Sequence, residues 1–310
     1  MVSLGYSIHL VCLLLGALLL QGFIKKMKAR LQGRQGPGLL QPYYDLSKLL
    51  KKDSVLSEHA SWVFRFAPYG VFVFTLTAAL FVPLYGPLAP MTYAGDCILV
   101  VYLLGMARFL QAIAALDTGS AFGGMGSSRE MTISSFVEPA LFMALFTVGL
   151  QVGSLNLSEM VLRVSKDGAG YLSLFNILLG ISFFVVLIAE TGRIPVDNPA
   201  THLELTMIHE AMILEYSGRY LALIEWSKAL KQFIFFALLV NLFLPVPVSR
   251  GEAVPLYPLG VFFLKLMVLG YIIAWVETLN AKLRLFRIPN LLLLSLCGSF
   301  LALLYCLFFL

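Results

Sequence analysis

Charged residues are scarce in this sequence. Only 13% of its 310 residues are Asp, Glu, Lys or Arg, whereas 59% are hydrophobic. A soluble globular domain carries about 25% charged residues, so the deficit excludes an ordinary soluble protein and indicates that lipid is the main solvent. The net charge of +5 comes from basic residues that gather in certain loops, and it does not indicate binding to nucleic acid.

Metal-ligating residues are also few. The four cysteines are scattered without C-x-x-C spacing, and of the four histidines only His9 falls inside a long apolar run. This pattern excludes a zinc or iron–sulfur site and a disulfide framework, because each needs ligands or cysteine pairs at suitable spacing. Nickel-ligating cysteine pairs and a nucleotide-binding glycine loop are lacking too. We therefore expect no cofactor, metal or catalytic residue on this chain, and any redox centre should belong to partner proteins.

Long apolar runs are what the sequence has in abundance. A helix that crosses a bilayer needs roughly 20 mostly apolar residues, and the runs do not alternate as barrel strands do. We predict an all-α polytopic membrane protein of eight transmembrane helices, with residues 1–310 as one integral membrane domain. The first run is followed, not preceded, by basic residues, which favours a span over a signal peptide. The eight runs are Leu4–Ile24, Phe66–Leu84, Cys97–Leu116, Met131–Gly153, Tyr171–Ala189, Trp226–Val246, Leu256–Val276 and Ile288–Leu310.

Basic residues are distributed unequally between the two sets of loops. The loops after odd-numbered runs hold 14 Lys and Arg residues, and those after even-numbered runs hold three. Because cytoplasmic loops carry the excess of Lys and Arg, we predict that both termini lie outside the cytoplasm of a cell (inner) membrane. The longer inner loops, Lys25–Arg65 and Glu190–Glu225, also carry most of the other polar chemistry. A protein with this distribution is expected to dock a partner on its cytoplasmic side.

The first inner loop combines turn residues with an amphipathic segment. Gly36, Pro37 and Gly38 interrupt the preceding helix. The segment Tyr43–Lys52 then has helical spacing, with Leu46, Leu49 and Leu50 predicted on one side. The chemistry leaves two readings open: a cytoplasmic amphipathic helix at the lipid headgroups, or a platform for a soluble partner.

Three segments together resemble a known family. The first is Arg34–Gln35–Gly36–Pro37–Gly38 with the following Leu40–Gln41, Asp45 and Lys48. The second begins at Leu116–Asp117–Thr118–Gly119–Ser120 and continues through Arg129, Glu130 and Val137–Glu138–Pro139. The third is Arg193–Ile194–Pro195–Val196–Asp197 followed by Glu215–Tyr216–Ser217–Gly218. In this order the chain resembles the respiratory complex I subunit 1 family, and the short first loop favours its energy-converting hydrogenase branch, which includes subunits similar to formate hydrogenlyase subunit 4 and hydrogenase-4 component C.

The resemblance implies a role without catalysis. It implies a membrane-anchoring, ion-translocation-coupling subunit that docks a soluble redox arm. The implied partners are soluble [NiFe] hydrogenase-like large and small subunits, an iron–sulfur subunit and antiporter-like membrane subunits in the lipid bilayer. The residues that we expect at the docking face are Arg34, Gly36, Pro37, Gln41, Asp45, Lys48, Asp117, Arg129, Arg193, Asp197 and Tyr216.

Several ionisable residues fall inside the apolar runs. Such residues are costly in lipid and are therefore candidates for function. Glu138 is either a carboxyl bonded to a neighbouring helix at the Pro139 kink or a proton-relay group, and the resemblance favours the relay. We expect Lys265 and Arg108 to pair with carboxylates inside the bundle. The predicted relay residues are Glu138, Glu190, Glu204, Glu215, Glu130 and Lys265.

The ends of the runs allow simpler interpretations. Glu190, at the end of the fifth run, would by itself be read as a solvated charge. Snorkelling of long side chains toward the headgroups accounts for Lys228 and Lys231.

The inner loop Glu190–Glu225, after the fifth run, departs from the quinone-type pattern. Val196 stands where the quinone enzymes carry Phe, and of their closely spaced glutamates only Glu204 remains. Asn198–Pro199 is a good helix start, so we predict a helix over Ala200–Ser217 that stops at Gly218. His202 and His209 lie seven residues apart and are too sparse for a metal site, so we expect structural or hydrogen-bonding roles.

Three other functions stay open from the sequence. The first alternative is the quinone-chamber subunit of an NADH–quinone oxidoreductase. The departures in the loops Lys25–Arg65 and Glu190–Glu225 disfavour it. A second is a secondary transporter, which would be expected to show internal repeats and broken helices. A third is a purely structural anchor, against which Glu138 and Lys265 count.

Overall fold

The computed structural model describes residues 2–57, 60–85, 89–171, 173–198, 207–244 and 256–309. Within these ranges every regular element is helical. The helices are α1 (Val2–Leu31), α2 (Gln41–Lys51), α3 (Trp62–Phe81), α4 (Asp96–Asp117), α5 (Ala121–Val152), α6 (Leu157–Asp167), α7 (Leu174–Glu190), α8 (Gly218–Phe243), α9 (Leu256–Leu279) and α10 (Ile288–Phe309). Short 3₁₀ turns are η1 (Gly168–Tyr171), η3 (Glu210–Met212) and η4 (Leu285–Arg287).

Six of these helices are long and apolar enough to cross a membrane: α1, α3, α4, α5, α9 and α10. The apolar helix α7 is shorter, at 17 residues. The 26-residue α8 is not among the six, and its first half carries Glu225, Lys228 and Lys231. The predicted all-helical membrane architecture is therefore confirmed for the described residues, whereas the predicted count of eight spans is not.

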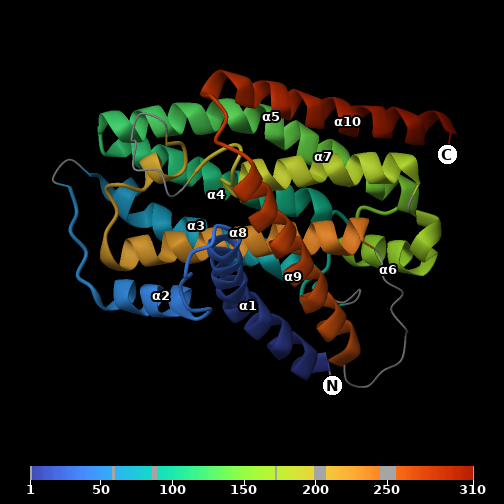
Figure 1. Cartoon of the computed structure of the whole chain (residues 1–310), viewed down its shortest axis with the longest axis horizontal. Coiled ribbons are helices and arrows are strands. Elements are labelled where there is room, and N and C mark those ends of the chain that lie inside the picture. The colour runs from blue at the N-terminus through green and yellow to red at the C-terminus, as the bar shows by residue number, and fades with distance from the viewer. Residues whose placement is uncertain are drawn as a thin grey trace.

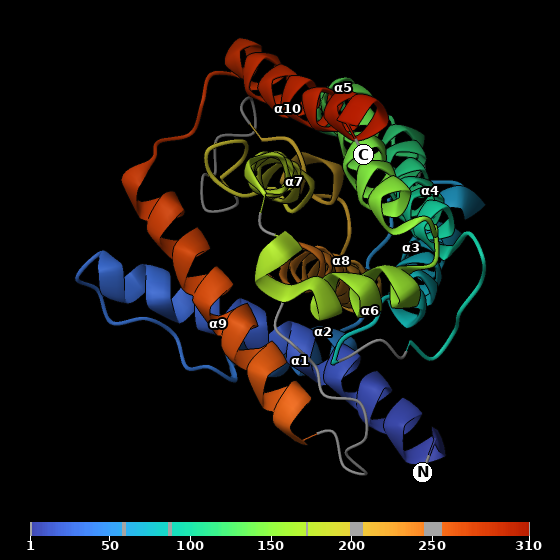
Figure 2. The same cartoon turned by 90° about the vertical axis from the view of Figure 1, so that its right-hand side faces the viewer.

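Helix α8 lies inside the bundle. It packs against α1, α2, α3, α6, α7 and α9, and Figure 2 shows these helices around it. Its residues Phe233, Phe235 and Phe236 are completely buried. Outside this centre, α10 packs on α5 and α7, and α1 crosses α9 (Figure 1). The arrangement brings α4, α5, α7 and α8 close enough to share side-chain contacts across the bundle.

The amphipathic helix predicted in the first inner loop is present as α2. Pro42 stands in its first turn, where its missing N–H costs nothing, and Leu46 faces the core while Asp45 and Lys48 are exposed. Leu49 is half-buried. Leu50 differs from the prediction, because its side chain is exposed and not on the covered face.

The helix predicted over Ala200–Ser217 is wrong for Met207–Ser217; its first part, with Glu204 and His202, lies outside the described residues. From Met207 onward the chain forms only η3 and turns. The Asp197 carboxylate accepts hydrogen bonds from the backbone N–H groups of Ile208 and His209, and these groups are then not donated to a helical ladder. Gly218 begins α8 instead of ending a helix. It has a φ of +53°, and a Cβ there would lie 2.6 Å from the Asp53 carbonyl oxygen.

Candidate functional site

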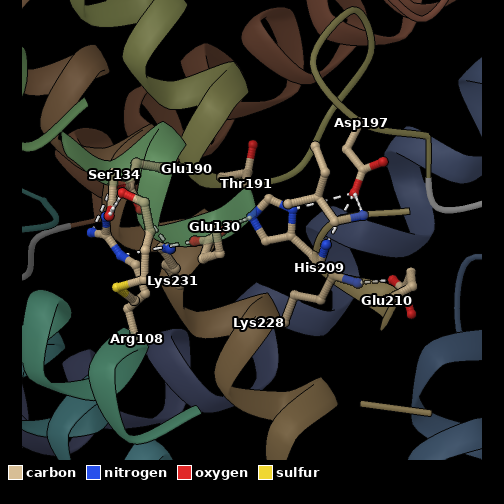
Figure 3. A network of polar contacts seen from close by, with 12 residues as sticks. Arg108, Glu130, Ser134, Glu190, Thr191, Asp197, His209, Glu210, Lys228 and Lys231 are labelled. Atoms are coloured by element: carbon tan, nitrogen blue, oxygen red, sulfur yellow. Dashed lines mark hydrogen bonds and ion pairs between the residues drawn. The ribbon is translucent and has the colours of Figure 1, made fainter. Parts of the chain in front are cut away.

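Arg108 is the centre of a group of ion pairs between helices (Figure 3). It lies on α4 and is only 6% exposed. Its Nη2 lies 2.9 Å from Glu190 Oε1 at the end of α7, and its Nη1 lies 3.2 Å from Glu138 Oε1 on α5. Its Nε lies 3.9 Å from Glu130 Oε1, also on α5. Arg108 is therefore paired inside the bundle, and with three carboxylates instead of one.

Lys231 adds a second cation to this group. Its Nζ, from α8, lies 2.6 Å from Glu190 Oε2, so each oxygen of the Glu190 carboxylate faces a different positive charge. The Glu190 side chain is 2% exposed. This corrects two interpretations of the sequence: Glu190 is not solvated, and Lys231 does not reach for the headgroups. Burying a carboxylate costs hydration free energy, which ion pairs offset only when further partners satisfy its oxygens. Here α4 and α8 supply these partners.

His209 joins this group to the loop between α7 and α8. Its Nε2 lies 3.3 Å from Glu130 Oε2, and its Nδ1 lies 3.3 Å from Asp197 Oδ2. Burial alone would lower the pKa of His209, but the carboxylates of Glu130 and Asp197 outweigh it and raise this pKa above its usual value. Gly192 makes room for the ring: its φ is +59°, and a Cβ there would lie 2.9 Å from His209 Nδ1. The imidazole is held as a bridge between two acids.

Asp197 is the best-bonded acid of this region. Its Oδ1 lies 2.7 Å from Lys282 Nζ, beyond the end of α9, and accepts from the Asn198 N–H. Burial alone would raise the pKa of Asp197, but the hydrogen bonds and charges of His209 and Lys282 hold it well below its usual range. Asp197 therefore stays ionised and fixes the side chain of His209.

A second group of ion pairs lies beside the first. Glu277 of α9 pairs with Lys28 of α1 at 2.7 Å and with Arg193 Nη1 at 3.0 Å. Arg193 Nη2 donates to Gln232 Oε1 of α8 at 2.8 Å. Nearby, Lys228 pairs with Glu210, which again corrects the snorkelling interpretation of the sequence.

Two cavities accompany these charges. One of about 50 Å³ is lined by Arg108, Glu130, Glu190, His209 and Lys231, among others. This is room for water, since one molecule needs about 10–15 Å³ by this measure. The other, of about 500 Å³, is lined by residues of α1, α8 and α9 and by the loop after α7. Thr191 and Lys228 line both cavities, so the two cavities are neighbours.

Glu138 lies at the outer edge of the network. Its side chain is 48% exposed, unlike those of Glu130 and Glu190. It lines a surface hollow of about 450 Å³ together with apolar residues of α3 and α4 such as Tyr102, Met106 and Phe109. The group is thus open on one side to whatever covers this face of the bundle.

The predicted relay residues have different positions. Glu130, Glu138 and Glu190 meet at Arg108. Glu215 is exposed, and no ion pair joins it to another described residue. Glu204 lies outside the described residues. Lys265 was expected to pair with a carboxylate, but its Nζ donates to the Leu244 carbonyl oxygen at 2.6 Å. That carbonyl follows the last turn of α8 and has no helical partner, so it is available as an acceptor.

The predicted docking residues fall into two sets. Those of the first loop are exposed: Arg34, Pro37, Gln41, Asp45 and Lys48. Gly36 packs against α1, where a Cβ would come within 2.8 Å of Ala29 Cβ.

The others make internal contacts. Tyr216 is 5% exposed, stacks on Phe64 and donates to its carbonyl oxygen. Asp117 accepts from the Ser61 N–H, and Arg129 donates to the Met207 carbonyl oxygen. Arg193 and Asp197 belong to the ion pairs described above. This second set shapes the loops from within.

The network includes residues that were predicted neither for the relay nor for docking, among them His209, Lys231, Glu277, Lys28 and Lys282. The signal in the sequence was that Lys231 falls within an apolar run and that Glu277 directly follows one. No group of three or more His, Cys, Asp and Glu suited to a metal occurs in the described part of the chain. The arrangement can hold and pass protons or charge, because acids, bases and room for water alternate along it.

Comparisons with known proteins agree on one family. The sequence model of the NADH dehydrogenase family matches residues 4–308. The chain is 36% identical to hydrogenase-4 component C of Escherichia coli over 235 residues, which are 76% of this chain and 73% of that protein. It is 34% identical to formate hydrogenlyase subunit 4 of the same organism over 277 residues, 88% of each chain. It is 29% identical to NADH-ubiquinone oxidoreductase chain 1 of Triticum aestivum over 297 residues, covering 89% of this chain and 87% of the relative.

A solved structure agrees on the fold. A chain of the membrane-bound sulfane sulfur reductase, an archaeal respiratory membrane complex, superposes with a TM-score of 0.83 at 23% identity. The match covers 97% of this chain and 99% of that one. At this identity the likeness concerns the fold alone.

Proposed function

Because the chain belongs to the NADH dehydrogenase subunit 1 family, we propose that it is the membrane-anchoring, ion-translocation-coupling subunit of a hydrogenase or formate hydrogenlyase-like complex. It carries no catalytic residue itself. Its partners are soluble [NiFe] hydrogenase-like large and small subunits and an iron–sulfur subunit on the cytoplasmic loops, and antiporter-like subunits within the bilayer. Two relatives, at 36% and 34% identity, are named for hydrogenase or hydrogenlyase components and support this choice.

The observation that carries the proposal is Arg108 with its three carboxylates. Three acids meet Arg108 and Lys231, and Glu130 also faces His209, so the net charge of the group depends on whether this imidazole carries a proton. His209 stands between this group and Asp197, at 3.3 Å from an acid on either side. A proton can pass from the imidazolium to Glu130. Once Glu130 is neutral, Arg108 shifts its charge toward Glu190 and Glu138.

In this proposal, redox chemistry is coupled to this group through the loop between α7 and α8. Asp197, His209 and Arg193 belong to the segments on which the soluble arm docks in this proposal. A change of charge or position there alters the proton affinity of His209 first and of Glu130 next. Glu138 is half-exposed beside an apolar hollow. It passes the proton or the change in charge to a membrane subunit that covers this face.

The quinone-chamber function is the weaker candidate. A quinone ring with its isoprenoid tail needs a largely apolar pocket. Seven of the thirteen described residues around the 500 Å³ cavity are charged: Lys25, Lys28, Arg193, Glu210, Glu225, Lys228 and Glu277. This lining suits water and protons better than a quinone, which supports the proposed role in a hydrogenase-like complex.

The test is Glu138→Gln in the whole complex, purified and placed in lipid vesicles. The neutral side chain keeps a similar shape but cannot exchange a proton, so ion movement per turnover should fall at least tenfold while hydrogen formation is largely retained. Glu159→Gln is the matched control, because Glu159 is an acid on α6, outside the network. Undiminished ion movement in Glu138→Gln would remove this residue from the relay.

A further inference from the structure

A large cavity lies at the opposite end of the bundle from α2 and the inner loops. Its volume is about 760 Å³, which is ample for a lipid headgroup. It opens between the end of α5, the amphipathic α6, the start of α7 and the last turns of α10. Figure 2 looks onto this end of the molecule, with α6 lying across it and the C-terminus of α10 beside α5. The ends of membrane helices lie where the headgroups of the bilayer are.

The lining carries positive charge without a protein counter-ion. Arg163 and Lys166 lie three residues apart on α6 and therefore point to one side of the helix. Across the described ranges no carboxylate comes within 4 Å of either cation, and Asp167 is the only acid that lines the cavity there. Arg163 Nη1 donates to the Val152 carbonyl oxygen at 2.5 Å. This bond orients the guanidinium and leaves its other N–H groups available.

Two residues that line the cavity also carry buried polar atoms without partners in the described part of the chain. Tyr171 is only 7% exposed, and its hydroxyl has no hydrogen-bond partner among the described residues. The Gln151 amide nitrogen donates to Asn176, whose own nitrogen donates to the Tyr171 carbonyl oxygen. These bonds fix the amide of Gln151 and leave its Oε1 as a buried acceptor without a partner in the described part of the chain. Buried polar groups are nearly always bonded, so an unpaired donor and an unpaired acceptor on two residues that line the cavity favour a ligand here.

An apolar lane leads away from the cavity. Leu174, Ile177 and Ile181 of α7 are 76%, 47% and 58% exposed, and their spacing puts them on one face of the helix. The lane starts next to Ser173 and Asn176, which line the cavity. Charge at the cavity and an exposed aliphatic stripe beside it match the two parts of a phospholipid. A free phosphate ion would use the first part only.

We propose that this cavity binds the phosphodiester headgroup of an anionic phospholipid in the leaflet opposite the docking loops. Arg163 and Lys166 hold the phosphate, the Tyr171 hydroxyl donates to one of its oxygens, and Gln151 Oε1 accepts from a headgroup hydroxyl. The acyl chains lie along Leu174, Ile177 and Ile181. The bound lipid thereby fastens α6 to the ends of α5, α7 and α10.

The experiment compares variants of the intact complex by native mass spectrometry in detergent with added phosphatidylglycerol. Lys166→Gln removes one cation without breaking the Arg163–Val152 bond, and the double change Arg163→Gln/Lys166→Gln removes both. Lys51→Gln/Lys52→Gln removes the same charge at the other end of the molecule and is the matched control. Charge-assisted bonds to phosphate lead us to expect about tenfold weaker binding for Lys166→Gln and a larger loss for the double variant, with none in the control.

A second measurement separates lipid from phosphate. The thermal midpoint of the wild-type complex is recorded with phosphatidylglycerol, with phosphatidylcholine and with inorganic phosphate. Phosphatidylglycerol should raise the midpoint most, and the rise should disappear in Lys166→Gln. An equal rise of the midpoint with inorganic phosphate would mean that the site binds a free anion and not a lipid. Equal lipid retention in both cation variants and the control would overturn the site.

Discussion

The two halves of α8 are stabilised in opposite ways. Its second half, from Phe233 to Phe243, is apolar apart from Asn241, which is bonded to the carbonyl oxygens of Pro83 and Leu84. Its first half carries Glu225, Lys228, Lys231 and Gln232, of which the last three form cross-helix pairs. Apolar packing accepts any neighbour of suitable shape. A charge in lipid needs a particular partner, so Lys231 of the first half specifies where α7 must place Glu190.

The difference shows where a mobile proton can be kept. Phe235 and Phe236 are completely buried and carry no group that titrates. Around Lys231 there are carboxylates, an imidazole and a cavity of about 50 Å³. The apolar half serves as a rigid and dry wall, and the charged half is where the state of the protein can change.

The largest effect should come from Arg108→Met, which removes the α4 cation at the centre of the ion pairs beside the charged half of α8. Glu130, Glu138 and Glu190 would then face one another with Lys231 as the remaining nearby cation of the bundle on Glu190. Breaking a buried pair costs about 3–5 kcal/mol, and three acids put this change near the upper end. Thermal unfolding of the purified complex measures it. A midpoint close to that of the wild type would show that the carboxylates do not depend on Arg108.

A somewhat smaller loss is expected for Phe236→Ala in the apolar half. Truncating a completely buried Phe leaves a cavity and costs about 3 kcal/mol. This variant separates the two halves of α8 by function, because ion movement per hydrogen formed should stay at the wild-type value in the complexes that remain folded. Vesicle assays of both quantities check it. Loss of coupling with intact folding would show that the apolar half also takes part.

The smallest effect concerns pH and His209. Its pKa is raised in the folded protein, so protonated His209 stabilises the fold fully below the usual histidine pKa of about 6.5, and this contribution disappears as the pH rises through the raised value. The stability difference between wild type and His209→Gln should therefore be about 1–2 kcal/mol at pH 6 and shrink toward pH 9.

Thermal midpoints across this range give the answer for His209, with exposed Glu215→Gln as a control whose difference should stay flat. A wild-type to His209→Gln difference that grows with pH would mean that burial, and not the two carboxylates, dominates at this imidazole.

The sequence could predict the general architecture because lipid imposes simple rules. Apolar length gives membrane helices, and turn residues followed by amphipathic spacing give α2. The candidate residues Glu130, Glu138 and Glu190 were also found, since acids near or within apolar runs stand out. Arg108 was expected to have a carboxylate partner, and it has three.

Partners could not be predicted, because they are set by helix packing. Arg108 and its acids are 22 to 82 residues apart in the sequence, and nothing local connects them. Lys231 looked like a snorkelling lysine because the sequence does not show that α8 is central. Lys265 found a free carbonyl at the end of α8 where a carboxylate was expected. The predicted helix after Pro199 is wrong over its described part because of a side-chain contact that helix propensity does not include. The Asp197 carboxylate accepts hydrogen bonds from backbone N–H groups that a helix would use.

Glu130 links the two parts of the network, with Arg108 on one side and His209 on the other. The most direct test is the ratio of ions moved to hydrogen formed by the intact complex in vesicles carrying Glu130→Gln, with Glu159→Gln as control. The account predicts that hydrogen formation continues and the ratio falls close to zero. An unchanged ratio would contradict a proton path through this chain of side chains.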